Sequence, residues 1–287
     1  MDSTNSFRVL WREVCNDKIA LIGFILFWVI VLTVYIWALF VDPAVLTAVD
    51  LLNRNQPPSA EFILGTGPAG QDMLPLLIVA ARNSFNIAFI VTIGTGIIGI
   101  LVGLIAGFYA GHTDNIIMRV IDFVGMVPFI MLVIVFVAII PNYNMFHLAG
   151  AFILFGWMGT ARLVRAMCLR QGRLDYVAAS KTLGTPNIVI IFREVLPNLI
   201  SIITSTLTLN LAANMGIETG LTFLGFGIPP GTPSLGRLIF FASVPYDMQN
   251  RMWLWLPAAL LIIIMMLCIN FVGQALNRAA DAKKRLV

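Results

Sequence analysis

The sequence predicts an all-α, polytopic membrane protein with six transmembrane helices. First, 59% of its 287 residues are hydrophobic and 11% are charged, whereas a soluble domain averages about 25% charged residues. Second, the mean hydropathy is +0.93, and six apolar segments are near the length of about 20 residues that a helix needs to cross a bilayer. Third, Lys and Arg are distributed unevenly between the loops, as in membrane proteins of defined orientation.

The six predicted spans follow one another along the chain with short connections. The first is too long for the apolar region of a signal peptide, which has about 7–15 residues, and no small-residue cleavage site follows it. Pro128 lies inside the third span and predicts a kink there. Near its inner end, Arg119 and Asp122 are spaced for a helical ion pair. The spans cover residues Ile19–Val41, Phe85–Tyr109, Ile116–Ile140, Met145–Leu163, Leu199–Phe226 and Met252–Leu276.

The positive charges predict that both termini are cytoplasmic. With the N-terminus inside, 14 of the 18 Lys and Arg residues are cytoplasmic. The outer ones are Arg54, Arg82, Arg237 and Arg251, and the inner ones are Arg8, Arg12, Lys18, Arg119, Arg162, Arg165, Arg170, Arg173, Lys181, Arg193, Arg278, Lys283, Lys284 and Arg285. We divide the chain into residues 1–82, with the first span and an outer loop, and a five-helix core at 83–287.

The composition argues against several functions. No soluble domain carries a basic patch with aromatic residues, so we expect no nucleic-acid partner. Cys15, Cys168, Cys268, His112 and His147 have no ligand spacing, so we expect no metal site. Two G-x-G-x-x-G stretches, at 65–70 and 94–99, lack a strand–turn–helix context, and no G-x-x-x-x-G-K-[ST] loop is present. We therefore expect no catalytic residue and no cofactor on this chain.

The second span carries a stripe of glycines, one every four residues. Small residues at this spacing allow a neighbouring helix to approach closely, although chance enrichment of glycine in a membrane helix is the alternative. We predict a helix-packing role for Gly99, Gly103, Gly107 and Gly111.

The fifth span carries a polar stripe, also spaced by four residues, on one slowly drifting helical face. Such groups are costly in a span and face a cavity or a protein neighbour. For Glu218, near the outer rim, three interpretations stay open: a cavity wall or outer gate, a buried helix contact, or a proton relay. The candidate lining of a translocation pathway is Thr206, Asn210, Asn214 and Glu218.

Residues 174–196 predict a helix–Gly–helix elbow on the cytoplasmic side. Gly184 ends a short helix, Thr185 can cap the next one, and Pro186 suits its first position. In the second helix the spacing predicts a buried face, made by Ile188, Ile191, Phe192 and Val195. The elbow either lies on the lipid headgroups or docks onto a cytoplasmic partner.

These residues resemble the EAA coupling loop of permease subunits of ABC importers. Ala178, Ala179 and Ser180 stand at the Glu-Ala-Ala positions, so the glutamate is missing, and Gly184 is the motif glycine. Further segments are similar to the second permease of dipeptide, oligopeptide and nickel importers: LGTGPAGQD at 64–72, GFYAGHTDNIIMRVID at 107–122 and IETGLTFLGFGIPPGTPSLGRLI at 217–239. TLGTPNIVIIF at 182–192 and INFVGQALNRAAD at 269–281 resemble the Gram-positive oligopeptide branch.

The resemblance implies an ATP-driven importer of oligopeptides or dipeptides in the cell membrane, working by alternating access. This chain would pair with a homologous permease, two cytoplasmic ATPases that hold ATP and Mg, and an extracellular substrate-binding protein. The coupling residues would be Tyr176, Ala178, Ala179, Ser180, Leu183, Gly184, Ile188, Ile191, Phe192, Leu196 and Pro197. Alternatives are transport of nickel, a metal chelate or glutathione by the same architecture, an ion-coupled secondary transporter, or a non-transporting scaffold.

Overall fold

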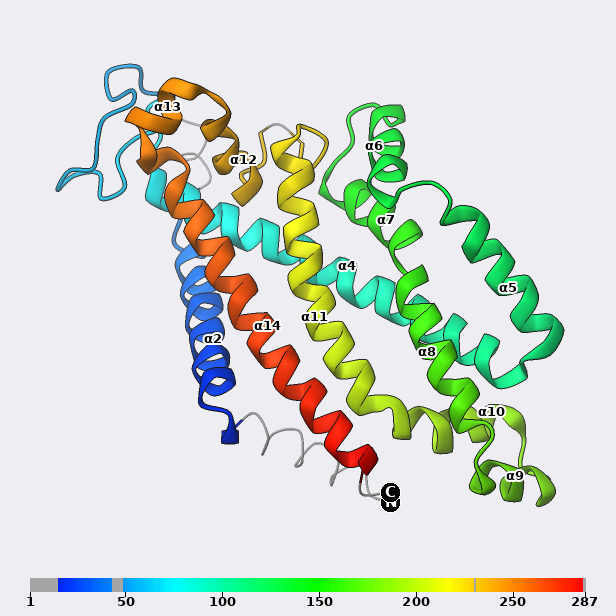
Figure 1. Ribbon diagram of the computed structural model, residues 1–287. Coiled ribbons are helices and arrows are strands. Elements are labelled where there is room, and N and C mark those ends of the chain that lie inside the picture. The colour runs from blue at the N-terminus through cyan, green and yellow to red at the C-terminus, as the bar shows by residue number, and fades with distance from the viewer. Residues whose placement is uncertain (1–14, 43–48, 230, 286–287) are drawn as a thin grey trace.

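The computed structural model describes residues 15–42, 49–229 and 231–285, with side chains described up to Ala280. Arg8, Arg12 and the side chains of Lys283, Lys284 and Arg285 lie outside this part. Within it the chain is helical and forms no β-strand (Figure 1). The α-helices are α2 (Lys18–Ala38), α4 (Met73–Tyr109), α5 (Gly111–Val124), α6 (Phe129–Ile139), α7 (Met145–Gly156), α8 (Met158–Gln171), α9 (Asp175–Thr182), α10 (Asn187–Ile190), α11 (Leu196–Phe223), α12 (Leu235–Ile239), α13 (Pro245–Asn250) and α14 (Leu256–Arg285).

Five segments of the described chain are long and apolar enough to cross a membrane, and α5 with α6 makes a sixth if that pair is counted as one span. The predicted third span is therefore not one continuous helix: α5 and α6 are bent by 70° at residues 125–128. Pro128 caps α6, and the residue before a proline is disfavoured in helical conformation. Met145–Gln171 also bends little enough to count as one span, although α7 and α8 are separate helices.

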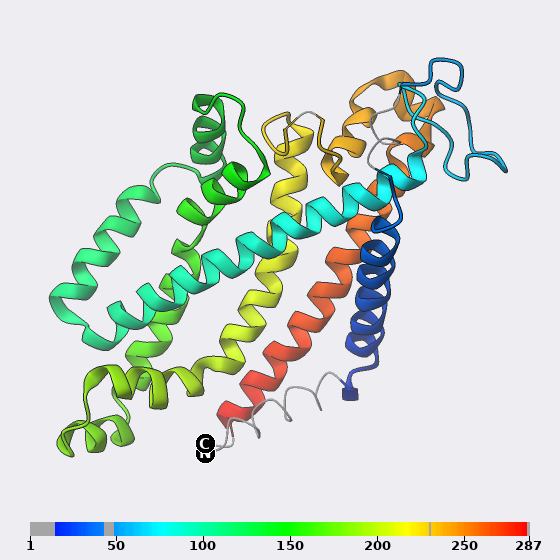
Figure 2. The ribbon, with the colours of Figure 1, turned by 180° about the vertical axis from the view of Figure 1, so that it is seen from behind.

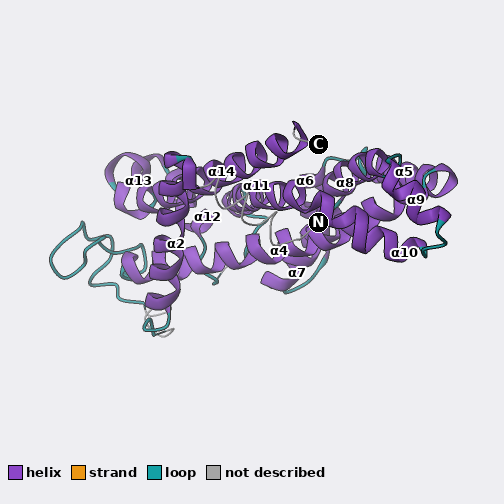
Figure 3. Ribbon diagram, turned by 90° about the horizontal axis from the view of Figure 1, so that it is seen from below, coloured by secondary structure: helices purple, strands orange, loops and turns teal. Residues whose placement is uncertain are grey.

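The helices form a flat slab, as the view from below shows (Figure 3). Helix α4 crosses the slab obliquely and packs against α2, α7, α8 and α11 (Figure 2). Its 37 residues make it about 55 Å long at about 1.5 Å per residue. A bilayer core is only about 30 Å thick, so a helix of this length must be tilted, as Figure 2 shows. The helix also begins ten residues before the predicted domain boundary at 83.

The beginning of α2 and the end of α14 lie at the same end of the slab, at the bottom of Figure 1, together with α9 and α10. We call this the elbow side. Asp17 caps α2 by accepting hydrogen bonds from the amides of Ile19 and Ala20 at 3.0 and 3.2 Å, and its carboxylate also pairs with Arg278 of α14. The loop at 49–72, α12 and α13 lie on the opposite side.

The glycine stripe of α4 packs closely on α8. A Cβ atom at Gly99, Gly103 or Gly107 would lie 2.6–2.7 Å from an atom of Thr160, Ala161 or Cys168. Gly111 differs from the prediction, because a Cβ there would have no neighbour within 4 Å. It lies beyond the end of α4, where its φ of +54° turns the chain into α5. Three glycines thus hold α4 and α8 together, and the fourth makes a turn.

Replacing Gly103 with Leu is expected to lower the stability of the folded chain by about 1–3 kcal/mol, the usual cost of overpacking a core. The backbone oxygen of Ala161 and the Cβ of Val164 leave no room for the larger side chain. Thermal unfolding of the purified protein in detergent measures the effect. Gly159→Leu is the matched control, since that position in α8 is open. Equal unfolding temperatures for both variants would contradict the packing role.

Candidate functional site

The elbow begins with α9, which ends in the predicted turn at Gly184. The amide of Gly184 donates to the carbonyl of Lys181 at 3.0 Å, and that of Thr185 donates to the carbonyl of Ser180 at 3.1 Å. This pair of bonds, with a φ of +79° at Gly184, is the Schellman arrangement that closes a helix C-terminus. Thr185 therefore completes the first helix and does not cap the second: Pro186 is the N-cap residue of α10, without a side-chain cap.

Hydrogen bonds between side chains hold the two arms of the elbow together. The hydroxyl of Ser180 in α9 lies 2.8 Å from both carboxylate oxygens of Glu194 in the second arm. Asn198 at the beginning of α11 also donates to the Tyr176 hydroxyl of α9 at 3.4 Å. Two further bonds are local in the chain: Asn198 donates to the Glu194 carbonyl at 2.8 Å, and the Tyr176 hydroxyl donates to Gln171 at 2.9 Å. Burial raises the pKa of Tyr176 above its usual value. The elbow is thus a structured unit with its own polar contacts.

The buried face of the second arm differs from the predicted one. Ile191 and Val195 are buried as expected, but Ile190 is buried as well, whereas Ile188 and Phe192 are 57% and 42% exposed. The physical reason is a π-helical stretch at Ile191–Val195, which changes the angle per residue, so the regular 3.6-residue spacing does not hold there. The exposed apolar side chains instead point outward from the elbow.

The exposed apolar part of the elbow consists of three large side chains: Leu183, Ile188 and Phe192. Leu183, at the end of α9, is 84% exposed. Ala178 and Ala179 on α9 are exposed too, whereas Val177 is fully buried against the core of the α4–α8 region. Leu196 and Pro197, both half-buried, begin α11 directly after the π-helical stretch. The elbow therefore presents apolar and small residues while remaining anchored by buried ones.

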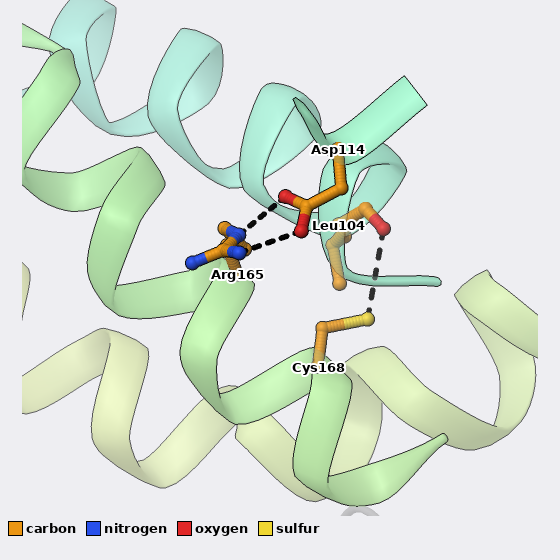
Figure 4. Close-up of polar contacts among 4 residues, drawn as sticks. All are labelled: Leu104, Asp114, Arg165 and Cys168. Carbon is orange, nitrogen blue, oxygen red and sulfur yellow. Dashed lines mark hydrogen bonds and ion pairs between the residues drawn. The ribbon is translucent and has the colours of Figure 1, made fainter. Parts of the chain in front are cut away.

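An ion pair joins α5 to α8 beside the elbow (Figure 4). Arg165 makes a two-pronged contact with Asp114: its Nε bonds Oδ1, and its Nη2 bonds Oδ2 at 2.6 Å. One turn further along α8, the Cys168 thiol lies 3.6 Å from the carbonyl of Leu104 in α4. Arg165 and Cys168 together link α8, which leads into the elbow, to both α5 and α4.

A second ion pair corrects the predicted Arg119–Asp122 interaction. Asp122 pairs with Arg162 of α8 at 2.8 Å, a residue 40 positions away that a local helical spacing cannot reveal. The basic side chain of Lys181 on α9 lies 4.7 Å from the centre of the Phe108 ring on α4. Contacts distant in sequence therefore connect the elbow region to α4, α5 and α8.

The polar stripe of α11 makes hydrogen bonds inside this chain. Asn210 donates to the Thr160 hydroxyl at 3.2 Å and Asn214 to the Thr92 hydroxyl at 2.8 Å. Thr206 donates to the carbonyl of Ile202 one turn earlier, and Glu218 is fully buried. The first three side chains are half-buried. Their role as pathway lining stays a prediction, and each has a defined neighbour in this conformation.

The described residues contain no cluster of three or more His, Cys, Asp or Glu side chains that could hold a metal ion. The elbow, the α5–α8 ion pair and the α11 stripe are held by the ion pairs and hydrogen bonds described above. Their contacts instead connect a surface element to membrane-crossing helices. The arrangement defines a multi-spanning membrane component with a structured elbow between two of its spans.

The comparison with known proteins identifies the family. Residues 99–286 match the family described as binding-protein-dependent transport system inner membrane component. The chain belongs to this family and is a multi-pass membrane component of a transport system.

Three peptide-transport relatives match over most of their length. The chain is 44% identical to the oligopeptide transport system permease protein OppC of Lactococcus lactis subsp. cremoris (strain SK11), over 95% of this chain and 93% of that one. It is 31% identical to OppC of Bacillus subtilis (strain 168), over 96% and 90%. It is also 31% identical to the dipeptide transport system permease protein DppC of that organism, over 96% and 85%.

Proposed function

We propose that this chain is one of two permease subunits of an ATP-driven importer that carries oligopeptides, or dipeptides, across the cell membrane by alternating access. The observation that carries the proposal is the 44% identity to an oligopeptide permease over 95% of the chain. A match of this extent includes the elbow, α11 and both sides of the slab. The chain itself would hydrolyse no ATP, because that activity belongs to two cytoplasmic partner subunits.

The elbow at residues 174–196 is the proposed contact to an ATPase subunit. Leu183, Ile188 and Phe192 give the elbow three exposed large apolar side chains, and apolar surface that gathers on one element is typical of protein interaction sites. Ala178 replaces the glutamate of the EAA motif, so contact in our proposal depends on shape and apolar burial. The Ser180–Glu194 hydrogen bond supports this role, since it keeps the arms in a fixed relation.

The flat shape supports a second permease subunit. A slab of helices (Figure 3) cannot surround a pathway alone, and many apolar side chains of α2, α5 and α6 are exposed, among them Trp28, Phe123 and Met131. Lipid would cover part of this surface, and a homologous permease would cover the part that faces the pathway. The polar face of α11 is the proposed lining contributed by this chain, with the extracellular binding protein delivering substrate to the side opposite the elbow.

Purification from the native membrane followed by reconstitution tests the proposed function. We expect a second permease, two ATPase subunits and a binding protein to accompany the chain, and ATP-dependent uptake of labelled peptides by the proteoliposomes. Labelled metal chelates and glutathione are the comparison substrates. Accumulation of a chelate without peptide would contradict the peptide assignment. Uptake that collapses with the proton gradient and persists without ATPase activity would instead favour an ion-coupled secondary transporter.

A further inference from the structure

Glu218 is a fully buried carboxylate in the last turns of α11, on the side opposite the elbow. None of the ion pairs among the described residues includes it. Its oxygens instead accept hydrogen bonds from hydroxyl groups: Thr222 at 2.8 Å, Thr219 at 3.4 Å, and Ser84 of α4. Burying a carboxylate is costly unless it is well hydrogen-bonded. These hydroxyl groups supply that compensation.

Two of these hydroxyl groups also accept hydrogen bonds from backbone amides that follow α11. The amide of Ile228 donates to the Thr222 hydroxyl at 3.0 Å, and the amide of Leu235 donates to the Ser84 hydroxyl at 3.1 Å. A hydroxyl has one proton to donate and two lone pairs that accept. Because each proton is directed at Glu218, a lone pair of each oxygen is free for the amide. Two chains of the form N–H···O–H···carboxylate therefore converge on one side chain.

The backbone held in this way belongs to the chain that returns from α11 to α12, and we call its described residues, 225–229 and 231–235, the return segment. Other contacts close it against the slab: Tyr143 donates to the carbonyl of Gly227 at 2.8 Å, and Asn83 donates to that of Pro233 at 2.9 Å. Neither involves Glu218. The two Glu218 chains reach the segment near its beginning, at the amide of Ile228, and at its end, at the amide of Leu235.

We propose that Glu218 is a positioning residue that holds the return segment across the outer ends of α4 and α11, through Thr222 and Ser84. The carboxylate is suited to this role because it can accept from several hydroxyls at once, whereas an amide oxygen accepts with fewer lone pairs. Chains of hydrogen bonds also strengthen one another in a buried environment. The consequence for transport, a correctly shaped outer surface, rests on the proposed function; the anchoring itself does not.

Amide hydrogen exchange of the assembled transporter in lipid nanodiscs tests the anchoring. In Glu218→Ala we expect exchange to accelerate about tenfold or more in the peptides that contain Ile228 and Leu235, because the hydroxyl groups that accept from these amides lose their shared hydrogen-bond acceptor. Thr222→Val is expected to accelerate exchange only in the peptide that contains Ile228, and Ser84→Ala only in the peptide that contains Leu235. Asn214→Ala is the matched control: it breaks an α11–α4 hydrogen bond one turn away and should leave both peptides unchanged.

The pattern of exchange decides the outcome. Unchanged exchange at both amides in Glu218→Ala would overturn the proposal, as would equal acceleration throughout α11, which indicates general loosening of the helix. If the Glu218→Ala transporter does not assemble, Glu218→Gln replaces it. Glutamine retains the size of the side chain and one acceptor oxygen, so we expect faster exchange in only one of the two peptides. Peptide uptake by the unaltered transporter is measured in parallel, so failure of the proposed function and failure of the anchor give different results.

Discussion

Replacing Leu183 with Asp is expected to prevent stable association of the chain with its ATPase partner and to reduce ATP-dependent uptake at least tenfold. The side chain is 84% exposed at the tip of the elbow, so the substitution should change folding stability by no more than about 0.5 kcal/mol. In a docked interface the same position would be buried, and an unpaired charge in the centre of an interface costs about 2 kcal/mol or more. Co-purification and uptake measure the two effects.

Leu52→Asp is the matched control for this prediction. Leu52 is 93% exposed, and it lies in the loop on the side opposite the elbow. The chemical change is identical, but the site is distant from any partner that binds the elbow. We expect Leu52→Asp to retain the ATPase at the parental level. Retention of the ATPase by Leu183→Asp as well would contradict docking through the elbow and favour an elbow that lies on lipid headgroups.

Reversing one charge of the Asp114–Arg165 pair is expected to destabilise the chain strongly. Asp114 is buried and its carboxylate receives two hydrogen bonds from one guanidinium. Removing one member of such a pair leaves an uncompensated charge, which typically costs about 3–5 kcal/mol. Arg165→Asp should therefore lower the unfolding temperature and abolish uptake, because α8 loses its link to α5. The double variant Asp114→Arg with Arg165→Asp should recover part of both.

The exposed pair of Asp122 and Arg162 provides the control within the same two helices. Both side chains are largely exposed, and surface ion pairs contribute only about 0–1 kcal/mol. Arg162→Asp is expected to change the unfolding temperature little. A thermal shift as large as that of Arg165→Asp, or no recovery in the double variant, would show that charge pairing at Arg165 is not what holds α5 to α8.

Local signals in the sequence predict some features of the site and not others. Gly184 could be predicted as a helix end because a left-handed residue after a helix favours glycine, and its φ is +79°. The partner of Asp122 could not be predicted in this way. Arg119 has a suitable local spacing, but in the structure Asp122 pairs with Arg162. The exposed positions of Ile188 and Phe192 were also missed. A π-helical stretch breaks the periodicity on which the prediction of a buried face depends.

The sequence by itself determined the class of this protein, the approximate position of its spans and the existence of an elbow. These follow from hydropathy, charge distribution and turn chemistry, which do not depend on which distant helices pack together. Only the tertiary structure decided which polar groups meet: Ser180 with Glu194, Arg165 with Asp114, and Glu218 with Thr222 and Ser84. The physical reason is that a buried polar group needs a partner, and packing of distant helices determines which partner is within reach.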